Sequence, residues 1–231
     1  MALGRRQTAE PPVEQVGWAS VQTFVVSAVE RPATVKRKHA VRGKQAVRVA
    51  RASKDLRVLA PCAFVGSATT LVPGLPGHSR LALYEDPDER TLLCSVEAPV
   101  DVDGEQRFLV RDAQGHLVGT LTRVPPRRRP FKHTWRIEQP GHPEIVGRSE
   151  WASGDAKEIA SRMAGKLLGG VLDAVGDLGA EGSDQPSKPR TLEWRAENKV
   201  VMISEGSAKV TVRAGWVDRR LAFAFALVGD R

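Results

Sequence analysis

The feature that most constrains the fold is the apolar run WVDRRLAFAFALVGDR at residues 216–231. Asp218 is suited to cap a helix, and the leucines and phenylalanines of 221–227, with alanines between them, cover every direction around a helix. A helix that is apolar on all sides is buried on all sides. A flat sheet would cover one face of it, whereas a closed β-barrel can surround it. The run therefore predicts a hydrophobic helix over 218–229 inside a barrel.

After about residue 58, short apolar runs alternate with turn residues roughly every ten positions, which is typical of a sandwich or barrel built from hairpins. The turn sequences DPDE, DVDG, DAQG and AEN supply the Gly, Asn and Asp that tolerate tight-turn dihedrals. In the clearest hairpin, 106–124, Phe108 and Val110 can point inward while Arg107 faces the other side. The pattern predicts about ten short antiparallel strands.

One segment departs from the β pattern. In GDAKEIASRMAGKLLGGVLDAVGDLG, apolar residues recur at every fourth position from Ile159 to Val175, which predicts an amphipathic helix over 154–178. Two consecutive glycines lie inside it and each costs about 1 kcal/mol relative to alanine, so we expect the helix to pack on the barrel or on a partner. With the polar loop that follows, the helix forms an insertion at 153–189.

The net charge of +8 is unevenly distributed along the 231 residues. Residues 1–60 hold 12 Lys and Arg against 4 Asp and Glu, while the rest of the chain holds 23 of each. The excess is concentrated in 31–57, where Asp55 is the single acidic residue. Such a stretch favours polyanions, either nucleic acid or an anionic membrane surface. Its phasing fits a strand through Val47 and Val49 and a weak helix equally well.

A second basic cluster lies in TRVPPRRRPFKHTW, a proline-framed loop between two expected strands. Arginine forks chelate phosphate, and Phe131 could enter a headgroup layer; a solvated turn kept soluble by its charge is the alternative. The candidate anion-binding or lipid-headgroup-binding residues of the two segments are Lys36, Arg37, Lys38, Arg42, Lys44, Arg48, Arg51, Arg127, Arg128, Arg129 and Lys132.

The sequence contains no motif of a common catalytic or metal site. GxSxG, Walker and GxGxxG patterns are absent, the five histidines have no HxxxH or HExxH spacing, and the two cysteines form no CxxC pair. We therefore expect no catalytic residue, no metal and no cofactor. The low cysteine content, the polar N-terminus and the lack of a long apolar stretch favour a cytoplasmic protein that can associate peripherally with a membrane.

Three stretches of the chain resemble the tubby-like barrel superfamily, which includes phospholipid scramblases and LURP-one-related proteins. RFLVRDAQGHLVGTLTR has the strand, D-x-x-G turn and second strand of the family's hairpin; HTWRIEQPGHPEIVGRSEW adds a Trp-containing strand and its return; VRAGWVDRRLAFAFALV supplies the last strand and the helix. The resemblance covers about residues 58–231 and implies about twelve strands threaded by the helix, with no cofactor or catalytic residue. Some members bind phosphoinositides, but no matching binding residues occur here. The insertion and the basic N-terminal segment depart from the family's pattern.

Together these patterns and the resemblance predict a mainly β (α+β) protein: a closed antiparallel β-barrel, of about twelve strands as the resemblance implies, around a buried hydrophobic C-terminal helix, with one additional amphipathic helix. We expect an N-terminal extension at 1–57 and the barrel domain at 58–231. The expected function is a non-enzymatic binding or scaffold module that associates with anionic phospholipid through its basic segments. The alternative is a nucleic-acid-associated protein that uses 31–57 as a non-specific clamp, although that stretch has no aromatic residue for base stacking.

Overall fold

The computed structural model describes residues 11–35, 37–52, 57–67, 79–125, 134–149 and 191–229. Thirteen strands and one helix make up this part of the chain. The strands are β1 (Thr23–Arg31), β2 (Val41–Ala52), β3 (Arg57–Ser67), β4 (Ser79–Tyr84), β5 (Leu92–Glu97), β6 (Val100–Val102), β7 (Glu105–Asp112), β8 (Leu117–Val124), β9 (Thr134–Glu138), β10 (Ile145–Ser149), β11 (Thr191–Ala196), β12 (Lys199–Glu205) and β13 (Lys209–Val212). The helix is α3 (Arg219–Val228).

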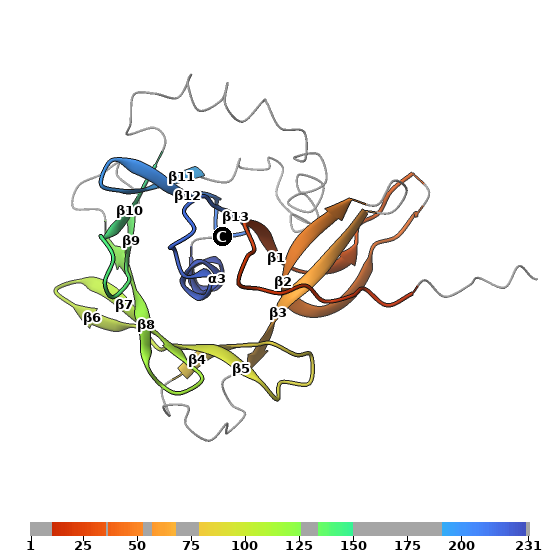
Figure 1. The fold of residues 1–231 in the computed structure, drawn as a ribbon, viewed down its shortest axis with the longest axis horizontal. Coiled ribbons are helices and arrows are strands. Elements are labelled where there is room, and N and C mark those ends of the chain that lie inside the picture. The colour runs from red at the N-terminus through yellow and green to blue at the C-terminus, as the bar shows by residue number, and fades with distance from the viewer. Residues whose placement is uncertain are drawn as a thin grey trace, which may run out of the picture.

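The strands form one antiparallel sheet that closes on itself (Figure 1). Around the ring the order is β5-β4-β3-β2-β1-β13-β12-β11-β10-β9-β8-β7, and pairing of β5 with β7 completes it. The short strand β6 pairs with β7 and is not needed for closure. The expected closed antiparallel barrel of about twelve strands is therefore confirmed.

Local sequence explains why the hairpins form where they do. Between β11 and β12, Glu197 and Asn198 both have positive φ, of 47° and 67°, as a two-residue type I′ turn requires. Along β7, Phe108 and Val110 are buried while Arg107 is exposed, as strand alternation predicts. Turn chemistry and period-two burial together set the register of these hairpins.

Helix α3 follows the last strand after a short connection at 213–218. The side chain of Asp218 accepts a hydrogen bond from the backbone N–H of Arg220 at 2.9 Å, so the predicted cap is confirmed. Every residue from Leu221 to Ala226 is buried, and α3 lies within the ring of strands in Figure 1.

Aromatic side chains connect α3 to strands on different sides of the ring. Phe225 meets Trp135 of β9 and Trp194 of β11 edge to face, with ring centroids 5.5 Å and 4.5 Å apart. Phe223 meets Phe24 of β1 in the same way at 4.8 Å. These contacts join the main core of the barrel to the helix.

The expected boundary between an extension at 1–57 and the barrel is wrong. Strand β1 pairs with β13, and β2 pairs with both β1 and β3, so both strands are part of the ring. The basic stretch left open between helix and strand is a strand over Val41–Ala52. This strand is difficult to recognise in the sequence because the side chains of β2 face two different hydrophobic cores and solvent in turn.

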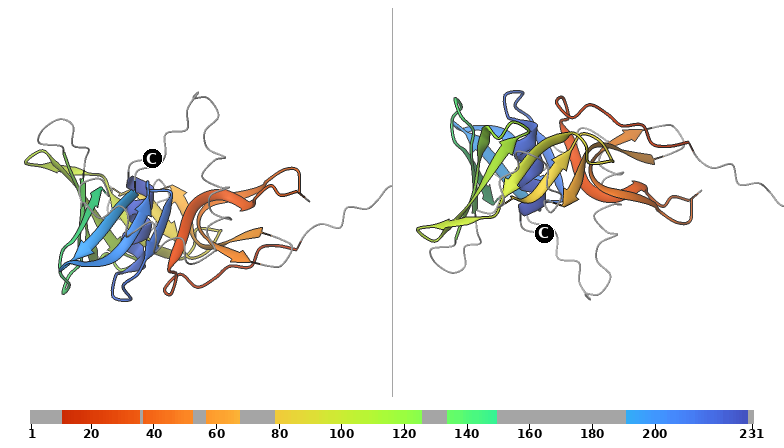
Figure 2. Two further views of the ribbon diagram at one scale, coloured as in Figure 1. Left: turned by 90° about the horizontal axis from the view of Figure 1, so that it is seen from above. Right: turned by 90° about the horizontal axis from the view of Figure 1, so that it is seen from below.

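The outer parts of β1, β2 and β3 extend beyond the ring as a separate lobe (Figure 2). Pairing of β1 with β13 ends at Val25, and pairing of β3 with β4 begins at Phe64. We call the described residues between these points, within 26–63, the lobe. It has a small core of its own in which Val29 and Leu59 pack with Val25.

Two expected elements lie outside the described residues: the insertion at 153–189 and the basic loop at 127–132. The strands on either side of the insertion are nevertheless paired, with Ser149 of β10 opposite Leu192 of β11. The insertion therefore leaves and rejoins the barrel at neighbouring positions.

Candidate anion-binding lobe

The lobe carries exposed cations and almost no acid. Glu30 is the single acidic residue among its described residues. Five cationic side chains are exposed there, namely Lys38, Arg42, Lys44, Arg51 and Arg57. A projecting surface with one sign of charge attracts polyanions from solution.

The exposed cations gather at the two ends of β2. Lys38 and Arg42 belong to the β1–β2 connection and the start of β2, while Arg51 and Arg57 lie near the β2–β3 connection, next to the pair formed by Ala52 and Arg57. Both ends project away from the ring in Figure 2. The lobe thus presents two basic tips.

Arg48 does not belong to this surface, contrary to the sequence-based expectation. Its side chain is 0% exposed, and Nη2 lies 3.2 Å from Oε1 of Glu30. Its other donors are directed to backbone carbonyls: Nε to Ser27 at 2.8 Å, Nη1 to Leu59 at 3.1 Å and Nη2 to Lys44 at 2.7 Å. Burial lowers the pKa of Arg48, and the Glu30 carboxylate opposes that shift. Arg48 is an internal support that cannot contact a headgroup.

The position of Arg48 explains how the lobe holds its shape. Beyond the ring, β1 is no longer paired with β13, and β3 is no longer paired with β4. The guanidinium donates to one carbonyl on each of these strands, Ser27 on β1 and Leu59 on β3, and so ties them together across β2. A planar fork with five donors suits this role, because a buried carbonyl without a partner is costly.

Two further candidate cations already donate hydrogen bonds within the protein. Arg37 donates from Nη1 to the carbonyl of Pro32 at 3.2 Å, and the Lys44 ammonium donates to the carbonyl of Pro87 in the β4–β5 turn. Lys44 remains exposed but stands next to the acidic DPDE sequence of that turn. Net positive charge is therefore strongest at the two tips. Lys36, Arg127, Arg128, Arg129 and Lys132 lie outside the described residues.

The described part of the chain offers little for nucleophilic or metal chemistry. Cys62 and Cys94 are both buried, and burial raises the pKa of each thiol to about 12, which keeps both protonated at neutral pH. Among the residues that the structure describes, no group of three or more His, Cys, Asp or Glu side chains could hold a metal ion.

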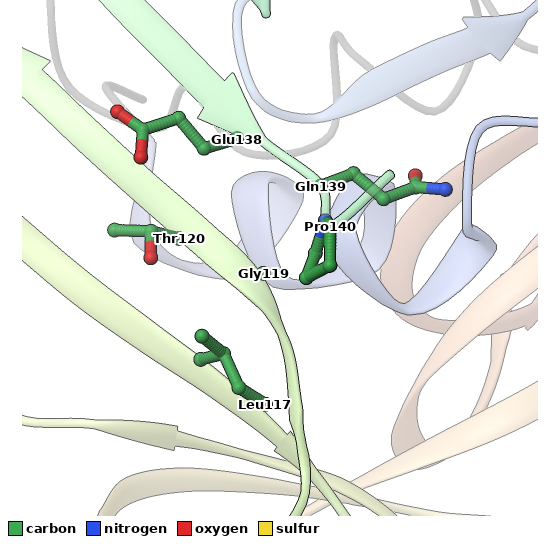
Figure 3. Close-up of a pocket in the computed structure, with 6 residues that line it drawn as sticks. All are labelled: Leu117, Gly119, Thr120, Glu138, Gln139 and Pro140. Atoms are coloured by element: carbon green, nitrogen blue, oxygen red, sulfur yellow. The ribbon is translucent and has the colours of Figure 1, made fainter. Parts of the chain in front are cut away.

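A small cavity of about 190 Å³ opens beside the ends of β8 and β9 (Figure 3). Its lining residues are Leu117, Gly119, Thr120, Glu138, Gln139 and Pro140. Glu138 is the one titratable group among them, and it has no acid or base partner in the lining. The cavity is also smaller than a typical small-molecule site of roughly 300–1,000 Å³.

No described helix is both long enough and apolar enough to cross a membrane. Comparison of the chain with protein-family models, curated proteins and solved structures finds no match. The charge and geometry of the lobe are therefore the observations on which a functional proposal can rest.

Proposed function

We propose that this protein is a non-enzymatic binding or scaffold module that associates peripherally with anionic phospholipid surfaces through the basic lobe. One observation carries the proposal: the lobe projects from the barrel with exposed cations at both tips, and the single acid among its described residues, Glu30, is paired with Arg48. The module would act in the cytoplasm without a cofactor.

The energetics favour such a surface. A Lys or Arg near an anionic leaflet contributes about 1 kcal/mol, so four cations at two tips would suffice for reversible association. Because Arg48 ties β1 to β3 internally, these strands need not become ordered on contact. Preorganised charge loses less conformational entropy on binding than a disordered tail does.

The tubby-like architecture is part of the same proposal. A closed ring of twelve antiparallel strands followed by a C-terminal helix supports it. In this interpretation α3 fills the barrel as a permanent plug and is not a membrane anchor. The lobe and the insertion at 153–189 would then be additions to the common barrel.

The test is co-sedimentation with neutral and anionic vesicles at low and high salt. Deleting the N-terminal segment is not informative, because β1 and β2 belong to the ring. We instead suggest the triple variant Lys38→Gln, Arg42→Gln and Arg51→Gln. The matched control changes three exposed arginines outside the lobe, Arg107, Arg148 and Arg213, to Gln.

We expect salt-sensitive binding that requires anionic lipid. The lobe variant should bind at least about tenfold more weakly, while the control, with the same net charge, should stay within about twofold. Equal loss in both variants would mean that net charge rather than the lobe drives binding. Absence of binding in all conditions would refute the proposal.

Nucleic acid is an alternative phosphate-rich partner for the lobe, and the same variants test this alternative. The described lobe residues include no Phe, Tyr or Trp side chain that could stack on a base. Duplex DNA added to vesicle-bound protein at fixed salt would leave binding unchanged if lipid is the partner. Displacement at micromolar DNA, with loss in the lobe variant, would instead support a non-specific clamp.

A further inference from the structure

The β1–β2 tip differs from the rest of the lobe because it exposes apolar side chains. Among the described residues, four large hydrophobic side chains are exposed: Val35 at 104%, Val100 at 57%, Leu117 at 45% and Val41 at 42%. Two of the four, Val35 and Val41, belong to this one tip. Single exposed valines are ordinary, but a pair flanked by cations on a projecting hairpin is not.

The turn that carries Val35 is held in place by hydrogen bonds. The N–H of Thr34 donates to the carbonyl of Arg37 at 2.7 Å, and the N–H of Arg37 donates to Oγ1 of Thr34 at 3.0 Å. The Arg37 side chain donates back to Pro32 at 3.2 Å. Val35 therefore follows a hydrogen-bonded residue, and its side chain is fully exposed.

The charges around Val35 match an anionic interface. Lys38 and Arg42 follow the turn and are exposed, and no described residue from 31 to 52 is acidic. At the opposite tip, Arg51 and Arg57 are exposed without a large exposed hydrophobic neighbour among the described residues. The β1–β2 tip therefore combines exposed apolar side chains with exposed cations.

We propose that Val35 inserts below the headgroups of an anionic leaflet, with Val41 at the boundary and Lys38 and Arg42 at headgroup level. The inference rests on the proposed function and adds the depth of the contact: Val35 of the β1–β2 tip reaches below the headgroups. Amphipathic surfaces of this kind bury their apolar part into the headgroup and acyl boundary.

Labelling tests the insertion directly. In the full chain, Val35→Cys and Val100→Cys would each carry an environment-sensitive fluorophore; Val100, on β6, is the matched exposed valine outside the lobe. The native thiols are buried and protonated, so they do not compete for the label. With anionic vesicles, emission from position 35 should shift to the blue and be quenched by spin-labelled lipid, and emission from position 100 should not change.

A second measurement uses neutral substitutions so that charge is constant. Val35→Asn should weaken partitioning onto anionic vesicles about five- to tenfold, as loss of a partly buried valine predicts, and Val35→Leu should tighten it. Val100→Asn should leave it unchanged. If the chain binds anionic vesicles but the label at 35 stays in water and Val35→Asn has no effect, insertion is wrong while surface association stands. If the chain does not bind vesicles at all, the proposed function fails as well.

Discussion

At the scale of single residues, Arg48 is the side chain on which the lobe depends most. Arg48→Met leaves the Glu30 carboxylate and the carbonyls of Ser27 and Leu59 without their donor. Because Glu30 is 27% exposed, we expect a loss of about 2–4 kcal/mol, somewhat less than the roughly 3–5 kcal/mol for breaking a fully buried pair. Urea unfolding with amide hydrogen exchange in β1 and β3 measures it. Arg51→Met, at an exposed position of the same strand, should cost less than about 0.5 kcal/mol. Equal stability of the two variants would contradict the role of Arg48.

The two thiols give a pH prediction. Burial raises the pKa of Cys62 and Cys94 from 9.0 to about 12. Since the folded pKa is the higher one, the fold favours the protonated thiol: this stabilisation is complete below pH 9 and is lost as the pH rises towards 12. Both thiols should resist a disulfide reagent at pH 8 and react upon unfolding in urea. Rapid reaction of either thiol in the native protein would contradict their burial.

At this scale the sequence identifies the basic stretch but does not separate its buried cations from its exposed ones. The sequence-based prediction groups Arg48 with Arg51, although one is buried and the other exposed. The reason is that β2 is covered on both faces: Val47 packs in the barrel core, and Arg48 lies on the other face, opposite Val25 and bonded to the carbonyl of Leu59 in the lobe. In a strand with one solvent face, alternation would leave one of two consecutive side chains exposed. Nothing in the local sequence signals the second covered face, because β1 and β3 supply it.

At the scale of secondary-structure elements, the contacts of α3 make a sharp prediction. Phe225→Ala removes the ring that touches Trp135 and Trp194 on two separate strands, in a site that is 1% exposed. We expect a loss of about 3–5 kcal/mol, because a cavity would remain between a helix and strands held by the ring. Val228→Ala, at the partly exposed end of the same helix, should cost much less. Thermal and urea unfolding compare them. Similar losses in both variants would mean that α3 contributes through its helicity and not through this contact.

The elements that sequence reasoning identified correctly share strong local signals. The Asp218 cap and the turn through Glu197 and Asn198 are specified by residue chemistry at fixed positions. The membership of β1 and β2 in the ring was missed because it depends on pairing with β13, nearly two hundred residues away in the register Thr23 with Thr211. A strand at the junction of two cores has no simple alternation to reveal it.

At the scale of the whole molecule, the structure gives the described basic residues of the N-terminal quarter a defined position on the barrel. The exposed cations of the lobe are not held on a loose tail, because the strands that carry them belong to the ring and project from it. The candidate surface is therefore fixed relative to the barrel. Whichever partner it binds, the barrel would be held in one orientation, as a scaffold requires.

The insertion at 153–189 offers the last test at this scale. Since Ser149 and Leu192 are paired, the strands that flank it can be joined by a short turn. Replacing 153–189 with a short Gly/Ser linker should leave the barrel folded and stabilise it by up to about 1–2 kcal/mol, because a shorter loop costs less entropy to close. Urea unfolding of the shortened and full chains measures the difference. A loss of more than about 2 kcal/mol would mean that the predicted amphipathic helix packs on the barrel. Unchanged or higher stability would leave its apolar face available to a partner.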